Sequence, residues 1–270
     1  MLRVLERVLN GPTLYRRDGI EVRERNGIRT LHLGSDTIQS AMRVDQPDTL
    51  ELSYTRAMMA FLLFCSPPRR VLLVGLGGGS LAKHIFRTMP EASIDVVEVN
   101  EGVVDVARTY FHLPAACPRL TLSIGDGADY VFSLEAQVDA LLVDAYDGRS
   151  LAASLATDHF FAGARRALGP VGVLAMNLWS NDRAFDRNVQ RIERAFYGRC
   201  LCLPAERPGN VIVLAFANEL EPARLRWATL HERAGELRER FGLEFPTFVR
   251  NLRQMNQHDA VGLKWFAESE

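Results

Sequence analysis

Residues 71–79 read VLLVGLGGG, and this stretch decides the fold. Its four leading apolar residues are typical of a buried parallel strand, and a helix-compatible run begins at Ser80. The pattern predicts a strand, a tight turn and the first turn of a helix. Glycine adopts positive φ and lets a ligand lie against the backbone, and the helix that follows points its free N–H groups at that ligand. The glycines of this candidate ligand loop are Gly75, Gly77, Gly78 and Gly79.

Three further predicted strands each end in an acidic residue. They cover residues 94–99, 120–127 and 140–144, and their acids are Glu98, Asp126 and Asp144. Because the carboxyl ends of parallel strands meet at one edge of a sheet, we expect the three carboxylates on one rim, where open α/β sheets bind ligands. Glu98, at the tip of the second strand, is placed to accept both hydroxyls of a ribose.

The bulk composition limits the class of protein. The chain has 270 residues, 47% of them hydrophobic, which suffices for one large domain or one large and one small domain. A net charge of −1 gives no indication of nucleic-acid or membrane-surface binding, and no apolar run approaches the roughly 20 residues that span a bilayer. The N-terminus is too charged for a signal peptide, so a cytoplasmic location is expected. The four cysteines lack zinc spacing, so reduced thiols and no metal site are expected.

The N-terminal region predicts a small β-hairpin unit. Asn26-Gly27 lies between two alternating segments within residues 19–33, which is a strong hairpin signal. Because alternate side chains are charged, one face is expected to be solvated, and His32 is expected to be a polar hairpin position rather than a ligand. Residues 1–12 predict a lead-in, and residues 34–48 predict a loop.

The rest of the chain alternates helices and strands. A helix is predicted over residues 50–65, a charged amphipathic helix over 221–241 and a last helical segment after Pro246. The other predicted helices cover residues 80–88, 101–110, 128–135, 158–168 and 183–197. The remaining predicted strands cover residues 171–177, 200–203 and 210–216. No helix separates the last two strands, so they predict an antiparallel hairpin at the end of a mostly parallel sheet, unlike a plain dinucleotide fold.

Assembled in this order, the residues resemble the spermidine synthase (polyamine aminopropyltransferase) family. Members combine an N-terminal β domain with a Rossmann-like, seven-stranded catalytic domain of the S-adenosylmethionine-dependent methyltransferase fold. The resemblance covers roughly residues 20–218 and implies an α/β protein divided into an N-terminal β unit with a Gln loop, residues 1–52, and a catalytic domain with C-terminal helices, residues 53–270. The matching pieces are Ile38-Gln39, the glycine loop, Glu98, Gly125-Asp126-Gly127 and the acids Asp144 and Asp147 of the run DAYDG.

The resemblance implies how a donor would be held. Gln39 would lie near the sulfonium nucleoside, Glu98 would hold the ribose, and Asp126, with Gly127 beside it, would hold the adenine amino group. The implied donor is decarboxylated S-adenosylmethionine, with intact S-adenosylmethionine as the alternative. A sulfonium donor is already activated, so no metal is required. A strand-end acid that binds no ligand remains the alternative for Glu98 and Asp126.

At the acceptor end the resemblance makes Asp144 the catalytic base and lets Asp147 grip the acceptor. An amine that is protonated at neutral pH cannot attack, so a partly buried carboxylate that takes its proton fits this chemistry. Asp147 is equally explained by an Asp-Gly turn. Tyr54 and Tyr146 are either acceptor contacts or core and covering aromatic residues. The implied partners are a small amine or other small acceptor and a second copy of the chain, since members are commonly dimers and the hairpin has an edge that could pair.

The chain departs from the family pattern at three places. Gly78 stands where the family usually has an Asp that meets the amine of the aminopropyl arm. Tyr54-Thr55-Arg56 replaces the usual Tyr-His-Glu, and residues 148–153 lack the usual Pro and Gly residues of a lid. Arg56 either faces the pocket, where it would repel a polyamine and pair with a carboxylate, or points to solvent from an exposed helix face.

Three functions therefore stay open from sequence. Aminopropyl transfer from decarboxylated S-adenosylmethionine to a di- or polyamine, which yields methylthioadenosine, rests on the family resemblance and on Asp144. Methyl transfer from intact S-adenosylmethionine to an unknown small acceptor rests on Gly78 and Arg56. The third is a non-catalytic nucleoside-binding homologue that has lost its acceptor site.

Overall fold

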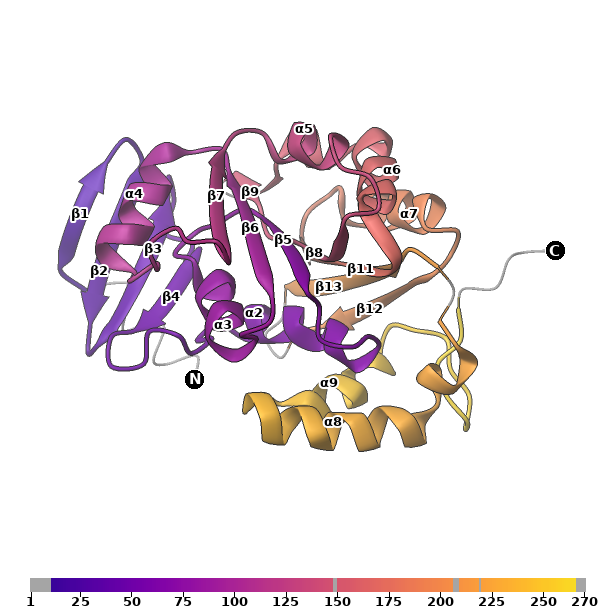
Figure 1. Ribbon diagram of the computed structural model, residues 1–270. Helices are drawn as coiled ribbons and strands as arrows, with labels where there is room; N and C mark the ends of the chain where they lie inside the picture. Colours follow the sequence, from indigo (N-terminus) through magenta and orange to yellow (C-terminus); the bar gives the residue numbers. More distant parts are fainter. Residues whose placement is uncertain (1–10, 148–149, 206–208, 219, 266–270) are drawn as a thin grey trace.

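The computed structural model describes residues 11–147, 150–205, 209–218 and 220–265 (Figure 1). Most of the predicted lead-in, residues 1–10, lies outside the described part, as do residues 148–149 of the segment that departs from the family's usual lid. The chain folds into a small antiparallel sheet beside a larger mixed sheet that carries helices on both faces (Figure 1). The candidate ligand loop lies on the larger sheet, on the side that meets the smaller one.

The larger sheet has seven strands, as the sequence predicts. In spatial order they are β12 (Cys200–Pro204), β13 (Asn210–Phe216), β11 (Leu168–Trp179), β8 (Val138–Val143), β5 (Arg70–Val74), β6 (Ser93–Glu98) and β7 (Leu120–Ile124). The five strands from β11 to β7 are parallel, and β13 is antiparallel to both β11 and β12. The expected parallel sheet with an antiparallel hairpin at its end is therefore confirmed.

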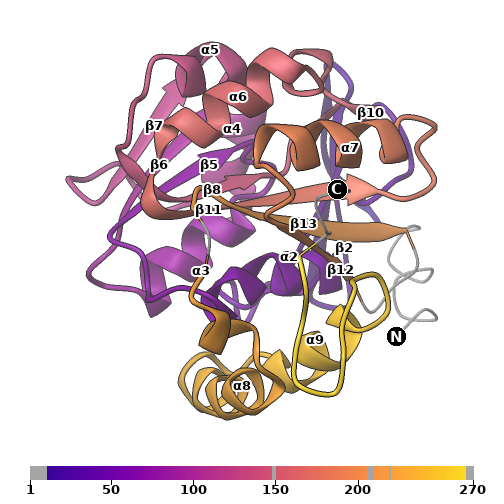
Figure 2. The same cartoon turned by 90° about the vertical axis from the view of Figure 1, so that its right-hand side faces the viewer.

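Helices cover both faces of this sheet, so its central strands are apolar on both sides (Figure 2). On β5, Leu73 joins one core cluster, and Leu72 and Val74 join the other. The first face carries α2 (Ser53–Met58), η1 (Met59–Leu63), α3 (Ser80–Thr88), α8 (Trp227–Phe241) and α9 (Phe245–Leu252). The second face carries α5 (Gly127–Phe132), α6 (Asp158–Ala167) and α7 (Phe185–Ala195). Helix α4 (Glu101–Tyr110) lies between β6 and the smaller sheet.

The smaller sheet has four strands rather than one hairpin. They are β1 (Thr13–Arg17), β2 (Ile20–Arg25), β3 (Ile28–Leu33) and β4 (Ser40–Arg43), paired in chain order. The Asn26-Gly27 turn is confirmed, and both residues have positive φ, of 54° and 73°. The prediction of a loop across residues 34–48 is wrong at β4, which is too short to show alternation and is defined by its pairing with β3.

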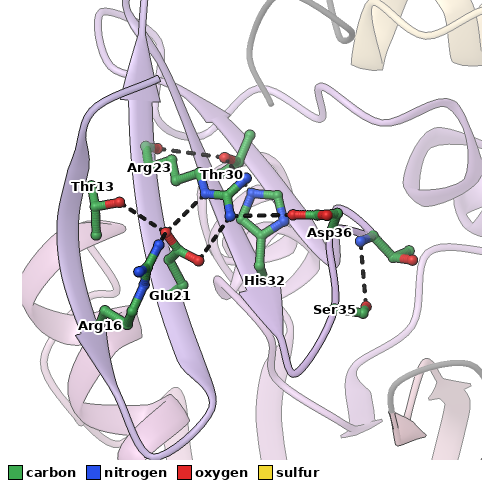
Figure 3. A network of polar contacts seen from close by, with 9 residues as sticks. Thr13, Arg16, Glu21, Arg23, Thr30, His32, Ser35 and Asp36 are labelled. Atoms are coloured by element: carbon green, nitrogen blue, oxygen red, sulfur yellow. Dashed lines mark hydrogen bonds and ion pairs between the residues drawn. The ribbon is translucent and has the colours of Figure 1, made fainter. Parts of the chain in front are cut away.

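The charged face of the smaller sheet is a hydrogen-bonded network (Figure 3). The Glu21 carboxylate, 12% exposed, accepts from Thr13 Oγ1 at 2.8 Å, Arg16 Nη2 at 2.6 Å and Arg23 Nε at 2.9 Å. The bond from Arg23 holds the pKa of Glu21 well below its usual value. His32 is buried, with Nε2 2.9 Å from Thr30 Oγ1, and burial lowers its pKa. The expectation of a freely solvated face is therefore wrong for these residues, because the side chains satisfy one another.

Two predicted helices are interrupted in the structure. The predicted helix 50–65 becomes α2 followed by η1. The predicted helix 221–241 breaks into η3 (Pro222–Leu225) and α8, with Arg226 extended at φ −70° and ψ 138°. The second break has a tertiary cause, because Arg226 forms an antiparallel bridge with Gly262 and the Trp227 N–H donates to the Val261 carbonyl at 2.9 Å. Pairing with a distant segment here overrides helix propensity.

Candidate active site

A cleft of about 590 Å³ opens at the carboxyl ends of β5, β6, β7 and β8. Strand β5 lies between β6 and β8, so this is the point where the strand order reverses and where α/β sheets bind ligands. Ile20 and Leu33 of the smaller sheet form part of its wall, and η2 (Ala153–Leu155) forms another part. The acidic residues that line it are Asp18, Glu98, Asp126 and Asp144. Among the described residues, no Lys, Arg or His side chain lines the cleft.

Only two of the four glycines of the loop line the cleft. Gly75 and Gly77 line the cleft, whereas Gly78 and Gly79 are not among its described lining residues. Gly75 has φ +91°, and a Cβ there would run into the carbonyl oxygen of Asp144. Only glycine therefore lets the end of β5 lie this close to the end of β8. Gly79, at φ 71°, is the residue from which α3 begins.

Gly78 has no room for the acid that the family usually carries. Its N–H donates to Ser40 Oγ at 2.8 Å. A Cβ at this position would lie 2.8 Å from Cδ1 of the Phe111 ring and 3.0 Å from Ser40 Cβ. Phe111 follows α4 and Ser40 opens β4, so two segments distant in sequence fill the space. The departure at this position is thus accompanied by a packing arrangement that a side chain would disrupt.

Glu98 ends β6 and is 9% exposed. Its Oε2 accepts from the Leu76 N–H at 2.8 Å, and its Oε1 accepts from the Asn100 N–H at 2.9 Å. The carboxylate thus fixes the glycine loop against the next strand while it lines the cleft. Each carboxylate oxygen has two lone pairs, so these bonds leave acceptor capacity for ribose hydroxyls.

Asp126 combines a local role with a position on the cleft wall. Its Oδ1 accepts from the Ala128 N–H at 2.6 Å, which caps the N-terminus of α5. Gly127 follows as the first residue of α5, and a Cβ there would run into Val74 of β5. Both residues line the cleft beside Glu98. The helix cap therefore orients the Asp126 carboxylate along the rim.

Asp144 follows the last residue of β8 and lines the cleft. Its Oδ1 accepts from Asn177 Nδ2 at 2.9 Å, and the Tyr54 side chain faces it. Burial raises the pKa of Asp144, and the side chains of Asn177 and Tyr54 act in the opposite direction. The Tyr54 hydroxyl also lies 3.0 Å from the Gln39 carbonyl oxygen, to which it can donate. The structure thus brings Gln39, Tyr54 and Asp144 together.

Tyr146 and Asp147 form the short strand β9, which pairs with β10 (Ser150–Leu151) beside the cleft. The Tyr146 hydroxyl donates to the Asn177 carbonyl at 3.2 Å. Burial, and then the charge of Asp144, raises the pKa of Tyr146. The side chain of Asp147 lies outside the described part of the structure, so its contact with an acceptor stays a prediction.

Arg56 has neither of its expected environments. Its Nε donates to Glu244 Oε1 at 2.7 Å, and its Nη1 donates to the carbonyls of Leu50 at 3.1 Å and Glu51 at 2.8 Å. The side chain is 14% exposed and is not among the described residues that line the cleft. Arg56 thus ties α2 to the residue that precedes α9. No local pattern predicts this pair, because its members lie 188 positions apart.

Three residues near the cleft were not identified from sequence. Asp18 lies with Gly19 in the left-handed turn between β1 and β2, where an Asp-Gly turn signal was available. Ser40 supports the glycine loop but lay within a segment predicted as loop. Asn177 is a polar residue inside the apolar run of β11, and a buried polar side chain in such a run signals a partner.

The described residues contain no cluster of metal ligands, no disulfide and no membrane-spanning helix. In that part of the chain, no group of three or more His, Cys, Asp or Glu side chains could hold a metal ion. All four cysteines are free thiols. None of the helices within residues 11–147, 150–205, 209–218 and 220–265 combines the length and the apolar character needed to cross a bilayer.

Comparison with known proteins adds independent findings. The spermine/spermidine synthase domain model matches residues 51–201. A polyamine aminopropyltransferase of Chromobacterium violaceum is 45% identical over 241 residues, which cover 89% of this chain and 92% of that protein. One from Neisseria meningitidis is 38% identical over 241 residues, with 89% and 91% covered.

The fold has matching solved structures. The crystal structure of a probable spermidine synthase from Corynebacterium glutamicum superposes with a TM-score of 0.70 at 19% identity, and the match covers 95% of this chain and 99% of that chain. At this identity the likeness supports the fold alone.

Proposed function

This chain belongs to the spermine/spermidine synthase family, and from that premise we propose how its cleft transfers an aminopropyl group. The chain is a transferase of the polyamine aminopropyltransferase type. The donor in our proposal is decarboxylated S-adenosylmethionine, bound as a substrate at the glycine loop. The acceptor is a di- or polyamine, and the products are methylthioadenosine and the extended polyamine.

The proposed reaction is one displacement. The neutral acceptor nitrogen attacks the CH₂ carbon next to the sulfonium, so the N–C bond forms and the C–S bond breaks. The sulfur keeps the bonding electron pair and leaves as the neutral thioether methylthioadenosine. That nitrogen is neutral because Asp144 has first taken one proton from the bound ammonium, and it becomes positive again, as a secondary ammonium, when the N–C bond forms. Since this leaving group needs no proton, the main requirements are a base and in-line positioning of nitrogen, carbon and sulfur.

The observation that carries the proposal is the charge of the cleft wall. Four acidic side chains line the cleft, and no basic side chain does so among the described residues. Both substrates are cations, a sulfonium and an ammonium, and carboxylates stabilise positive charge most strongly where water is partly excluded. A cleft built for phosphates or for the carboxylate of an acidic substrate would instead be expected to present Arg or Lys.

The donor end and the acceptor end have distinct proposed roles. Glu98 accepts hydrogen bonds from the ribose hydroxyls, Asp126 accepts one from the adenine amino group, and Gln39 lies beside the sulfonium. At the other end Asp144 takes the proton of the amine. Tyr54 and Tyr146 contact the acceptor, and Asp147 grips its distal amine.

The two alternatives lose support in the structure. Methyl transfer from intact S-adenosylmethionine rested on Gly78 and on an Arg56 that could bind the donor carboxylate, yet Arg56 is paired with Glu244. A non-catalytic homologue would be expected to turn Asp144 away from the donor, yet Asp144 lines the same cleft as Glu98 and Gly75. Aminopropyl transfer requires neither an Arg56 that faces the cleft nor an Asp144 that points away from the donor.

The test is product analysis with a defined donor and acceptor. Purified protein incubated with decarboxylated S-adenosylmethionine and putrescine should release methylthioadenosine and spermidine in equal amounts, and Asp144→Asn should remove most of the activity. Absence of methylthioadenosine across a panel of diamines and polyamines would overturn the proposal.

We also propose a homodimer in the cytoplasm. Strand β1 is an edge strand of the smaller sheet, and its residues are largely exposed, including Leu14. An open strand edge can pair with a second copy of itself. Four free cysteines suit a reducing compartment. A monomer in light scattering at micromolar concentration would contradict the dimer.

A further inference from the structure

Three adjacent strands, β8, β11 and β13, each bring one polar residue close to the carboxyl end of β8. Met176 of β11 pairs with Val143 of β8, so the next residues, Asn177 and Asp144, lie side by side. Asn177 also pairs with Ile212 of β13, and Asn210 lies two residues away on the same strand. Residues two apart on a strand share a face, so Asn177 and Asn210 are diagonal neighbours.

These residues form a continuous hydrogen-bonded row. Asn210 Nδ2 donates to Asn177 Oδ1 at 3.0 Å, and Asn177 Nδ2 donates to Asp144 Oδ1 at 2.9 Å. Asn177 is 3% exposed and has apolar neighbours on its strand, so its carboxamide depends on these partners. A side chain kept polar at this depth needs a reason, and its partner is the acid at the reacting end of the cleft.

The chemistry of the groups fixes the direction of the row. An ionised carboxylate only accepts hydrogen bonds, so Asn177 must turn its NH₂ group toward Asp144. Its oxygen then faces Asn210, which must present its own NH₂ group. Only this orientation satisfies all three residues with Asp144 ionised. The Asn210 carboxamide therefore fixes the orientation of the Asn177 carboxamide, although Asn210 does not touch Asp144.

We propose that Asn177 and Asn210 are positioning residues that hold Asp144 ionised and oriented until the acceptor amine arrives. This inference rests on the proposed role of Asp144 as the base. Because Asn177 engages Oδ1, the other carboxylate oxygen is the better acceptor for the proton of the amine. The bond to Asn177 remains possible after proton transfer, so the acid keeps its place through the reaction.

The neighbouring titratable groups do not compete with this assignment. Tyr54 from α2 and Tyr146 from β9 face Asp144, and burial raises the pKa of both phenols. Both stay neutral over the range in which a carboxyl group titrates. Asp18, Glu98 and Asp126 are further carboxyl groups of the same cleft, so Asp144 is reported by the part of the acidic limb that moves when Asn177 is replaced.

The test is the pH profile of kcat/KM for paired variants. Asn177→Leu keeps the side-chain size but removes the donor, and we expect the acidic limb to move up by about 1 to 2 pH units, the effect of one hydrogen bond to a charged group. Activity should approach the wild-type value above the shifted limb. Asn210→Asp should move the same limb upward by a smaller amount, because an acceptor there draws the NH₂ group of Asn177 away from Asp144.

Asn188→Leu is the matched control, because it removes a buried carboxamide on α7 outside the row. It should leave the limb in place. A uniform loss of rate at every pH in Asn177→Leu and Asn210→Asp, with an unmoved acidic limb, would overturn the proposed positioning role.

A second measurement tests the positioning of Asp144 independently of the proposed reaction. In ¹³C-aspartate-labelled protein, the Asp144 carboxyl signal is assigned by its disappearance in Asp144→Asn, and its titration requires no turnover. If the wild type makes no product, the proposed reaction fails. An upward shift of the Asp144 titration in Asn177→Leu would still support the positioning role of Asn177. An identical Asp144 titration in wild type and Asn177→Leu contradicts the positioning role of Asn177 even if turnover is normal.

Discussion

The two ends of the cleft are built differently. At the donor end, the acids are held by backbone N–H groups nearby in sequence or at the adjoining strand tip: Glu98 accepts from Leu76 and Asn100, and Asp126 accepts from Ala128. At the acceptor end, Asp144 accepts from the side chain of Asn177 on β11, and the side chain of Tyr54 on α2 faces it. A backbone-built end can keep its geometry while sequence varies around it, whereas a side-chain-built end changes with each partner.

The substitution with the largest expected effect disables the acceptor end of the cleft and leaves the donor end intact. Asp144→Asn keeps the size of the side chain but removes the base, so kcat should fall by about 10²- to 10⁴-fold. Donor affinity, measured by calorimetry with decarboxylated S-adenosylmethionine, should change little. Asp139→Asn is the control, because Asp139 lies in β8 near its opposite end and binds the N–H groups of Arg69 and Arg70. Equal losses of donor affinity and kcat in Asp144→Asn would show that the two ends are not separable.

The next effect breaks the donor end. Glu98→Gln replaces a carboxylate oxygen by an NH₂ group that must face a backbone N–H, so the glycine loop loses a partner. We expect donor KM to rise by about 10- to 100-fold, the scale of one hydrogen bond to a charged group, with a smaller change in kcat. Glu101→Gln, on the exposed first turn of α4, is the control. A lower kcat at unchanged donor KM would contradict the assignment.

A third effect concerns the support beneath the glycine loop. Lys83 of α3 is buried and donates to the Phe111 carbonyl at 2.6 Å, and burial lowers its pKa to about 8. Between about pH 8 and 10.5 the unfolded chain binds more protons at this residue than the folded chain, so the free energy of unfolding rises with pH. Its contribution should grow by on the order of 3 kcal/mol across that window.

Denaturation curves of wild type and Lys83→Met across this range measure that contribution, because the other titrating groups are common to both proteins. Lys264→Met removes the other lysine, which is exposed, and should not alter the slope. A constant stability difference between wild type and Lys83→Met from pH 7.5 to 10.5 would refute the assignment.

The smallest effect probes Gly78. A methyl group there meets Phe111 and Ser40, so Gly78→Ala should lower stability by about 1–3 kcal/mol through overpacking. Gly235→Ala places a methyl group in open space on α8 and should raise stability by roughly 0.5–1 kcal/mol. Equal stability changes for the two variants in urea would show that the donor end tolerates side chains at position 78.

The same contrast explains what the sequence could predict. The seven-stranded sheet and its hairpin follow from apolar runs and from the missing helix between β12 and β13. The grouping of Glu98, Asp126 and Asp144 on one cleft follows from the geometry of parallel strands. The pairing of Arg56 with Glu244 and the break at Arg226 depend on partners far away in the chain, so local pattern carried no signal for them. Strand β4 pairs with the nearby β3, but it is too short to show alternation.

The most direct test is a competition between the two donors. Wild-type protein is given putrescine with equal concentrations of decarboxylated and intact S-adenosylmethionine, and one mass spectrum counts both nucleoside products. The account predicts methylthioadenosine in large excess, with matching spermidine. S-adenosylhomocysteine as the main product, together with a methylated amine, would contradict it.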